Sequence, residues 1–137
     1  MRSIVFFLLC SSLLYSIRTG TADRRELLCH RWRVFARKHA EGAAYLKKIP
    51  DGPGTPQEEY RTDGVFLNGV GNLTPDTGKW SLNAEGTEIS IERLTFGGHR
   101  VFGNSPAPIL SRVIRTLTAD TLIYVQDHEA NYFVRVK

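Results

Sequence analysis

Residues 27–39 read LLCHRWRVFARKH, and the conformation of this stretch decides the fold of the chain. As a helix, it would place Leu28, Trp32, Phe35 and His39 on one stripe of an otherwise basic surface, which is typical of helices that lie on anionic membranes. As a strand, it would turn every second side chain from Leu28 onward to the same face. The rest of the chain is needed to choose between the two conformations.

The later part of the chain has the two-residue period of half-buried strands. Residues 79–83 read KWSLN and residues 87–96 read TEISIERLTF, and both segments alternate apolar with polar side chains. Such alternation indicates strands with one buried and one wet face. The sequence AEG at residues 84–86 joins the two segments, so we predict a hairpin there.

We therefore expect an all-β domain of about eight antiparallel strands in an up-and-down barrel, because closure of the sheet leaves no exposed edge. The expected strands cover residues 29–38, 57–62, 64–72, 78–83, 87–96, 110–118, 121–127 and 131–137, with a weaker pattern for a short strand at 99–103. In this arrangement residues 29–38 form the first strand, and a short helix over residues 23–28 precedes it. Residues 47–59 contain three prolines and two glycines, so we expect a long surface loop without regular structure there.

Residues 1–22 have the layout of a secretory signal peptide. A positively charged start precedes an apolar run that is too short for a transmembrane helix, and small residues follow up to Ala22. Cleavage near Ala22 leaves residues 23–137 as one barrel domain of an exported protein, which is periplasmic, associated with the outer membrane or secreted. Cys10 raises a lipid anchor as an alternative, but a lipidated cysteine needs a small residue before it, and Leu9 stands there.

The charge of the chain is unevenly distributed. The formal net charge is +4, and residues 23–48 carry eight Lys or Arg against three Asp or Glu, whereas residues 49–137 carry eight against eleven. A basic N-terminal third suits an acidic partner or an anionic membrane surface. Export, and the lack of a basic and aromatic RNA-binding signature, argue against nucleic acid as a partner.

The stretch that opens with Cys29 does not predict a metal or haem site. Cys29 is followed directly by His30, whereas haem attachment requires C-x-x-C-H. The remaining histidines, His39, His99 and His128, are scattered along the sequence, and metal ligands must converge. We expect no metal and no cofactor, and Cys29 is read as a small buried hydrophobic residue.

The sequence offers little support for an enzyme. Asp127, His128 and Glu129 cluster in an expected turn, and His99 lies in a Gly-rich loop, so these groups are the candidates for acid–base chemistry. No nucleophile elbow, zinc-protease motif or phosphate-binding loop accompanies them. We therefore interpret the cluster as a hydrophilic hairpin tip, and we predict no catalytic residues.

Four segments together resemble a known family. They are LLCHRWRV at 27–34, YRTDGVF at 60–66, GKWSLNAEGTEISI at 78–91 and IRTLTADTLIYV at 114–125. In this order and spacing they are similar to the lipocalin-like domains of secreted bacterial proteins, although His30 stands where that family usually has glycine. The resemblance implies a calycin-type barrel without catalytic residues. It also implies that Arg135, on the last strand, stacks on Trp32 as a structural cation–π pair.

The side chains expected to face the barrel interior are all aliphatic or aromatic. They are Trp32, Val34, Phe66, Trp80, Leu82, Ile89, Ile91, Ile114, Leu122, Tyr124 and Phe133. A closed barrel of eight strands has room for its own side chains or for one small ligand. The set therefore predicts either an apolar cup, in a binding module for a small hydrophobic ligand, or a filled core. In the second case the basic N-terminal third, with Arg31, Arg33, Arg37 and Lys38, would make the protein an envelope interaction protein.

Overall fold

The computed structural model describes residues 20–39, 46–71, 73–93, 95–97, 99–100 and 106–137. Its strands are β1 (Arg31–His39), β2 (Lys47–Lys48), β3 (Pro56–Tyr60), β4 (Val65–Val70), β5 (Asp76–Leu82), β6 (Glu88–Arg93), β7 (Thr95–Phe96), β8 (His99–Arg100), β9 (Ile109–Leu117), β10 (Thr121–Gln126) and β11 (Glu129–Arg135). One helix covers residues 20–28. The predicted signal peptide, with Cys10, lies outside the described residues except for its last three.

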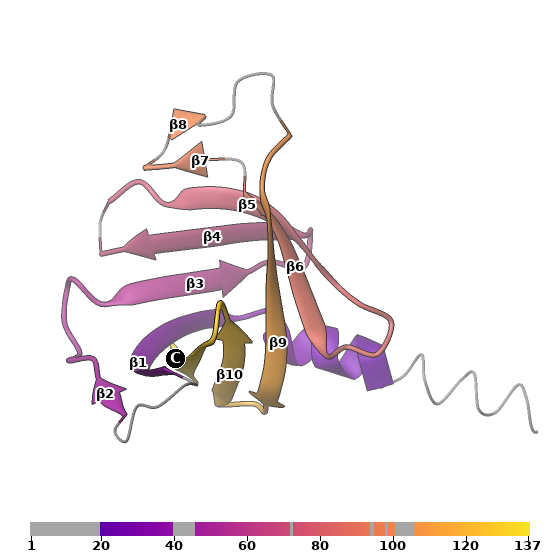
Figure 1. Cartoon of the computed structure of the whole chain (residues 1–137), viewed down its shortest axis with the longest axis horizontal. Helices are drawn as coiled ribbons and strands as arrows, with labels where there is room; N and C mark the ends of the chain where they lie inside the picture. The colour runs from indigo at the N-terminus through magenta and orange to yellow at the C-terminus, as the bar shows by residue number, and fades with distance from the viewer. Residues whose placement is uncertain (1–19, 40–45, 72, 94, 98, 101–105) are drawn as a thin grey trace, which may run out of the picture.

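The main sheet closes into an antiparallel barrel (Figure 1). Its strands follow the order β11-β10-β9-β6-β5-β4-β3-β1-β2, and β11 also pairs with β1. Eight strands thus form the ring, while the two-residue strand β2 lies beside the second half of β1. Strands β7 and β8 form a separate two-stranded sheet. The predicted all-β barrel with a short N-terminal helix is confirmed.

The stretch that decides the fold is a helix end followed by a strand, as predicted. Residues up to Leu28 are helical, and the strand β1 begins at Arg31. The helix covers one end of the barrel, because Leu28 is fully buried and its carbonyl accepts a hydrogen bond of 2.9 Å from Trp32 Nε1. On the same side, Arg24 Nε donates to the carbonyl of Gly86 at 2.7 Å. The helix is therefore the floor of the barrel, and the opposite end is its mouth.

Two expectations about strand boundaries were wrong. Residues 47–59 are not all loop, because Lys47–Lys48 forms β2 and β3 already begins at Pro56. Proline suits the first position of a strand, since its missing N–H is not needed there. The single strand expected over residues 87–96 is divided, because β6 ends at Arg93 and β7 pairs with β8 instead. Residues 101–103 of the weakly predicted strand lie outside the described residues.

A β-bulge in β1 changes which side chains reach the mouth. Val34 is the register partner of Phe133, but the pairing shifts before Ala36, so that Arg37 becomes the partner of Asn131. A bulge of one residue reverses the alternation of faces along a strand. Arg37 therefore shares a face with Asn131 at the mouth, and the two-residue period before the bulge does not predict it.

Candidate functional site

The predicted interior residues lie in the core of the barrel. Ten of them are buried, namely Trp32, Val34, Phe66, Trp80, Ile89, Ile91, Ile114, Leu122, Tyr124 and Phe133, and Leu82 is partly buried against them. Tyr60 joins them, with its ring centroid 5.1 Å from that of Phe66 and 5.6 Å from that of Trp80. Close packing of this kind is the ordinary state of a protein interior. The half of the barrel nearest the helix is thus occupied by these side chains.

A charged network crosses the barrel above this core. Arg112 of β9 is 4% exposed, and its Nη1 donates to Glu58 Oε2 at 2.8 Å and to the Tyr60 hydroxyl at 2.7 Å. Its Nε donates to Gln126 Oε1 at 2.8 Å. The Tyr124 hydroxyl donates to Glu58 Oε1 at 3.0 Å, and Glu58 itself is 6% exposed. Both carboxylate oxygens of Glu58 are therefore bonded, and the ion pair is almost completely buried.

Aromatic rings cover the guanidinium of Arg112. Its central carbon lies 4.4 Å from the ring centroid of Tyr124 and 5.1 Å from that of Phe66. Contacts of this type between a cation and a ring face contribute about 0.5–2 kcal/mol. They also hold the guanidinium between β4 and β10, so the network separates the packed core from the mouth.

The network shifts the pKa of its members in a consistent direction. Burial raises the pKa of the Tyr60 phenol, and burial together with the Glu58 carboxylate raises the pKa of the Tyr124 phenol. Burial alone would lower the pKa of Arg112, but Glu58 and both phenol groups raise it above its ordinary value. Arg112 is thus a fixed positive charge beside two phenols that stay neutral at ordinary pH.

Sequence reasoning missed Glu58 and Arg112. The predicted cup was apolar, yet Glu58 lies two positions before the buried Tyr60, and Arg112 lies two positions before the buried Ile114. The two-residue period already places both charges on the inner face. The signal was present, but charged residues are rarely buried unless they are paired, and the pairing becomes visible only in three dimensions.

A pocket of about 400 Å³ opens at the mouth above the network. It is lined by Val34, Arg37, Pro56, Glu58, Asn68, Val70, Arg112, Tyr124, Gln126, Asp127, Glu129, Asn131 and Phe133. The predicted interior residues Val34, Tyr124 and Phe133, together with Pro56 and Val70, thus share this space with eight polar or charged residues. Small-molecule sites commonly combine an apolar wall with a few placed polar groups, so this pocket is the candidate site.

The rim of the mouth pocket carries further charges. Arg37 Nε lies 3.5 Å from Glu129 Oε1. Asp127 and His128 form the two-residue turn between β10 and β11, and both have a positive φ, 49° for Asp127 and 64° for His128. Aspartate and histidine adopt this backbone conformation more readily than most residues. The acid–base candidates Asp127, His128 and Glu129 are therefore together at a hairpin tip, whereas His99 lies on β8 in the separate sheet.

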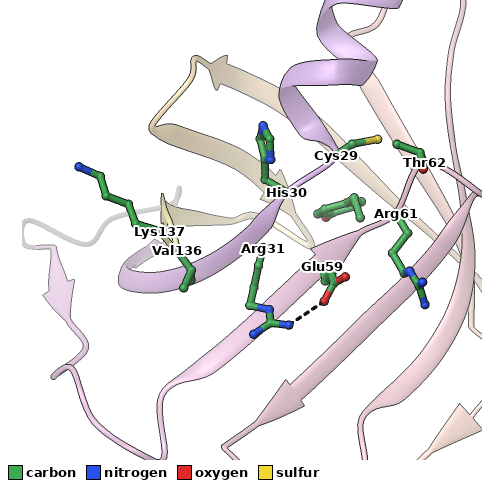
Figure 2. A pocket seen from close by; sticks show the side chains of 9 residues that line it. Cys29, His30, Arg31, Glu59, Arg61, Thr62, Val136 and Lys137 are labelled. Carbon is green, nitrogen blue, oxygen red and sulfur yellow. Dashed lines mark hydrogen bonds and ion pairs between the residues drawn. The ribbon is translucent and has the colours of Figure 1, made fainter.

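A second pocket, of about 450 Å³, lies beside the helix end of the barrel (Figure 2). Cys29, His30, Arg31, Glu59 and Thr62 are among its lining residues, and Arg31 Nη2 pairs with Glu59 Oε2 at 3.2 Å. Burial raises the pKa of the Cys29 thiol, and burial together with Arg135 lowers the pKa of His30. A thiol with a raised pKa is a poor nucleophile. In the described part of the chain, no group of three or more His, Cys, Asp or Glu residues is placed to hold a metal.

Trp32 and Arg135 are cross-strand partners, but their side chains differ in environment. Trp32 is fully buried while Arg135 is exposed, and the ring that contacts Trp32 is that of His30, with centroids 6.3 Å apart. A stack of Arg135 on Trp32 is not among the cation–π contacts of the described residues. The tryptophan that a guanidinium covers is Trp80, where the central carbon of Arg25 lies 4.4 Å from the ring centroid.

Three of the eight Lys and Arg residues in the basic N-terminal third form ion pairs, and all three lie on β1. Arg31 pairs with Glu59, Arg33 with Asp51 and Arg37 with Glu129. Lys38 is exposed. Because carboxylates lie against three of the four cations proposed for docking, little concentrated positive charge remains on this strand.

Comparison with solved structures identifies the fold. A lipocalin-like protein from Bacteroides uniformis has a TM-score of 0.61 at 21% sequence identity, and the match covers 80% of this chain and 99% of that protein. An uncharacterized protein from Bacteroides eggerthii has a TM-score of 0.58 at 15% identity with the same coverage. No protein-family model and no curated protein sequence matches the chain. The chain has the lipocalin-like fold that the sequence resemblance predicted.

Proposed function

We propose that this lipocalin-like barrel is a binding module that holds one small molecule in the mouth pocket. The observation that carries the proposal is the pocket of about 400 Å³ above the Glu58–Arg112 pair. Barrels of eight strands have room for one small ligand, and the packed core leaves that room at the mouth. The proposal assigns no chemical reaction to the site.

The pocket supports a ligand with both apolar and polar parts. The sequence predicted a small hydrophobic ligand, and Val34, Val70 and Phe133 do offer an apolar wall. However, eight polar or charged residues also line the pocket, and a purely apolar ligand would take their exposed polar groups out of water without offering them hydrogen bonds, which is costly. We therefore propose an amphiphilic or polar molecule rather than a purely apolar one.

Native mass spectrometry of the protein purified from its own host tests the proposal. We expect a non-covalent adduct of constant mass, and we expect it to be lost from the variant Asn68→Trp, which fills the pocket from β4. The matched control is Leu67→Trp, because Leu67 is the adjacent residue on β4 and lies against a different, outer pocket. Binding that survives Asn68→Trp, or a native protein without any adduct and without response to a small-molecule screen, would refute the binding module.

The alternative of docking through the basic strand has less support. The ion pairs of Arg31, Arg33 and Arg37 reduce the charge that an acidic partner would meet. A liposome-binding assay with anionic lipids tests docking directly. If the protein binds such liposomes and a variant that neutralises these arginines does not, docking through the basic strand would be supported.

We also propose that the protein is exported, on the sequence of residues 1–22. Within the described part of the chain, no helix has the length and apolar character needed to cross a membrane. The mass of the mature protein tests the proposal, because cleavage near Ala22 predicts an N-terminus at Asp23. A mass that includes residue 1 would refute it.

A further inference from the structure

We infer that the ligand of the mouth pocket is a small organic cation with N–H donors, such as a primary amine. This inference rests on the proposed binding module and narrows it to one chemical class.

The charges of the lining do not balance. The ionisable lining residues are Glu58, Asp127, Glu129, Arg37 and Arg112. The two arginines are engaged, Arg112 with Glu58 and Arg37 with Glu129. Among the lining residues that the structure describes, Asp127 alone has a charge without an ionic partner, and its Oδ2 accepts only the neutral Gln126 amide at 3.2 Å. The pocket therefore carries one net negative charge, which a cation would neutralise.

Asn131 supplies an acceptor that points to the same class of ligand. This residue is 8% exposed, and its Nδ2 donates to the carbonyl of Glu129 at 3.2 Å. A carbonyl can only accept, so this bond fixes the orientation of the amide. The described residues offer no donor to Asn131 Oδ1. Among the described residues, every side-chain oxygen or nitrogen that is fully buried has a hydrogen-bond partner. Asn131 Oδ1 has none, so it must be accessible to solvent. The space that Asn131 lines is the mouth pocket.

An anionic ligand fits this lining less well. It would meet Arg112 only in competition with Glu58, whose carboxylate is 2.8 Å from Nη1. It would also add a negative charge to a lining that already holds three carboxylates, and like charges at close range repel. A long acyl chain has no path downward, because the Arg112 side chain lies across the base of the pocket against Phe66 and Tyr124.

Isothermal titration calorimetry with four probes tests the class of ligand. The probes are putrescine as the cation, butanediol as its neutral analogue, succinate as the dianion and decanoate as the fatty acid. We expect putrescine to bind most tightly, and we expect its affinity to fall with rising salt. The variant Asp127→Asn removes the charge while keeping a residue that tolerates positive φ, and it should weaken putrescine binding by about two- to fivefold, as expected for an exposed ion pair.

The matched control is Asp120→Asn, which removes the same charge from an exposed turn at the other end of β10. It should leave the affinity for putrescine unchanged. If succinate or decanoate binds instead, and Asn68→Trp abolishes that binding, the amine class is wrong while the binding module stands. If putrescine binds equally to both aspartate variants, Asp127 does not recognise it and the inference is overturned. If no probe binds and the native protein carries no adduct, the binding module fails together with the inference.

Discussion

Replacing Arg112 with methionine should destabilise the barrel strongly. Methionine keeps much of the side-chain volume but removes the guanidinium, so the Glu58 carboxylate stays buried without its cation. The side chains of Arg112 and Glu58 are only 5% and 7% exposed, and 2.8 Å separates Nη1 from Oε2. Removing one partner of such a buried pair costs about 3–5 kcal/mol of unfolding free energy.

This loss corresponds to a fall of about 10–25 °C in Tm for a domain of this size. It would be a large part of the total stability of an ordinary domain, which is about 5–15 kcal/mol. Urea denaturation followed by tryptophan fluorescence measures it, with Trp80 and Trp32 as buried reporters. Arg115→Met is the matched control, because Arg115 lies on the same strand but is exposed, and it should change the stability by less than about 0.5 kcal/mol.

The decisive variant is the double change of Arg112→Met with Glu58→Gln. The glutamine is neutral, and its carbonyl can still accept a hydrogen bond from Tyr124 or Tyr60, so the second substitution should recover about 2 kcal/mol or more of what the first removed. Glu58→Gln alone should be destabilising, since it leaves Arg112 without a counter-ion. Additive losses in the double variant, or a cost below about 1 kcal/mol for Arg112→Met alone, would refute the buried ion pair.

Three further predictions concern stability. Burial raises the pKa of Tyr60 and Tyr124, so the folded state retains two protons that the unfolded chain releases near pH 10. The stability that these protons contribute is therefore complete below about pH 10 and should fall by about 2 kcal/mol by about pH 11. The urea midpoint measured against pH tests this. Gly78→Ala should cost about 1–3 kcal/mol, because its Cβ would lie 2.8 Å from the backbone oxygen of Glu92; Gly52→Ala, which has open space around it, should be nearly neutral in the same thermal melt. Leu28→Ala should cost about 2–5 kcal/mol, because the side chain of this last helical residue is fully buried in the barrel core, and an unchanged Tm would contradict the helix as the floor of the barrel.

The fold was largely predictable because one physical rule governs most of the chain. Alternating side chains defined β5, β10 and β11 to within two residues of their ends and β6 at its start, and the helix and strand before and after Cys29 followed from the need to close the sheet. The short strand β2 was not predictable in this way, because two exposed lysines carry no alternation. Its partner is β1 beyond the bulge, where Arg37 pairs with Lys47, and the bulge itself has no signal in the sequence.

The site was predicted less well than the fold. The alternation of apolar and polar residues predicted the apolar interior. It does not show that Glu58 and Arg112, which lie far apart in the chain, pair across the barrel with 2.8 Å between Nη1 and Oε2. Nor does it show the bulge that turns Arg37 toward the mouth. The Glu58–Arg112 pair and the bulge both depend on strand register, which is set by the pairing of all the strands in the barrel.

The pairing of the last strand with the first has a consequence for synthesis. Strand β11 supplies register partners for β1 from Trp32 to His39, so the ring cannot be completed until residue 135 has left the ribosome. Contacts so distant in sequence make folding slow, and an incomplete chain would present β1 and β10 as two unpaired edges that can recruit other chains. Truncation or proteolytic clipping ahead of Glu129 should therefore yield a self-associating product instead of a merely weakened monomer.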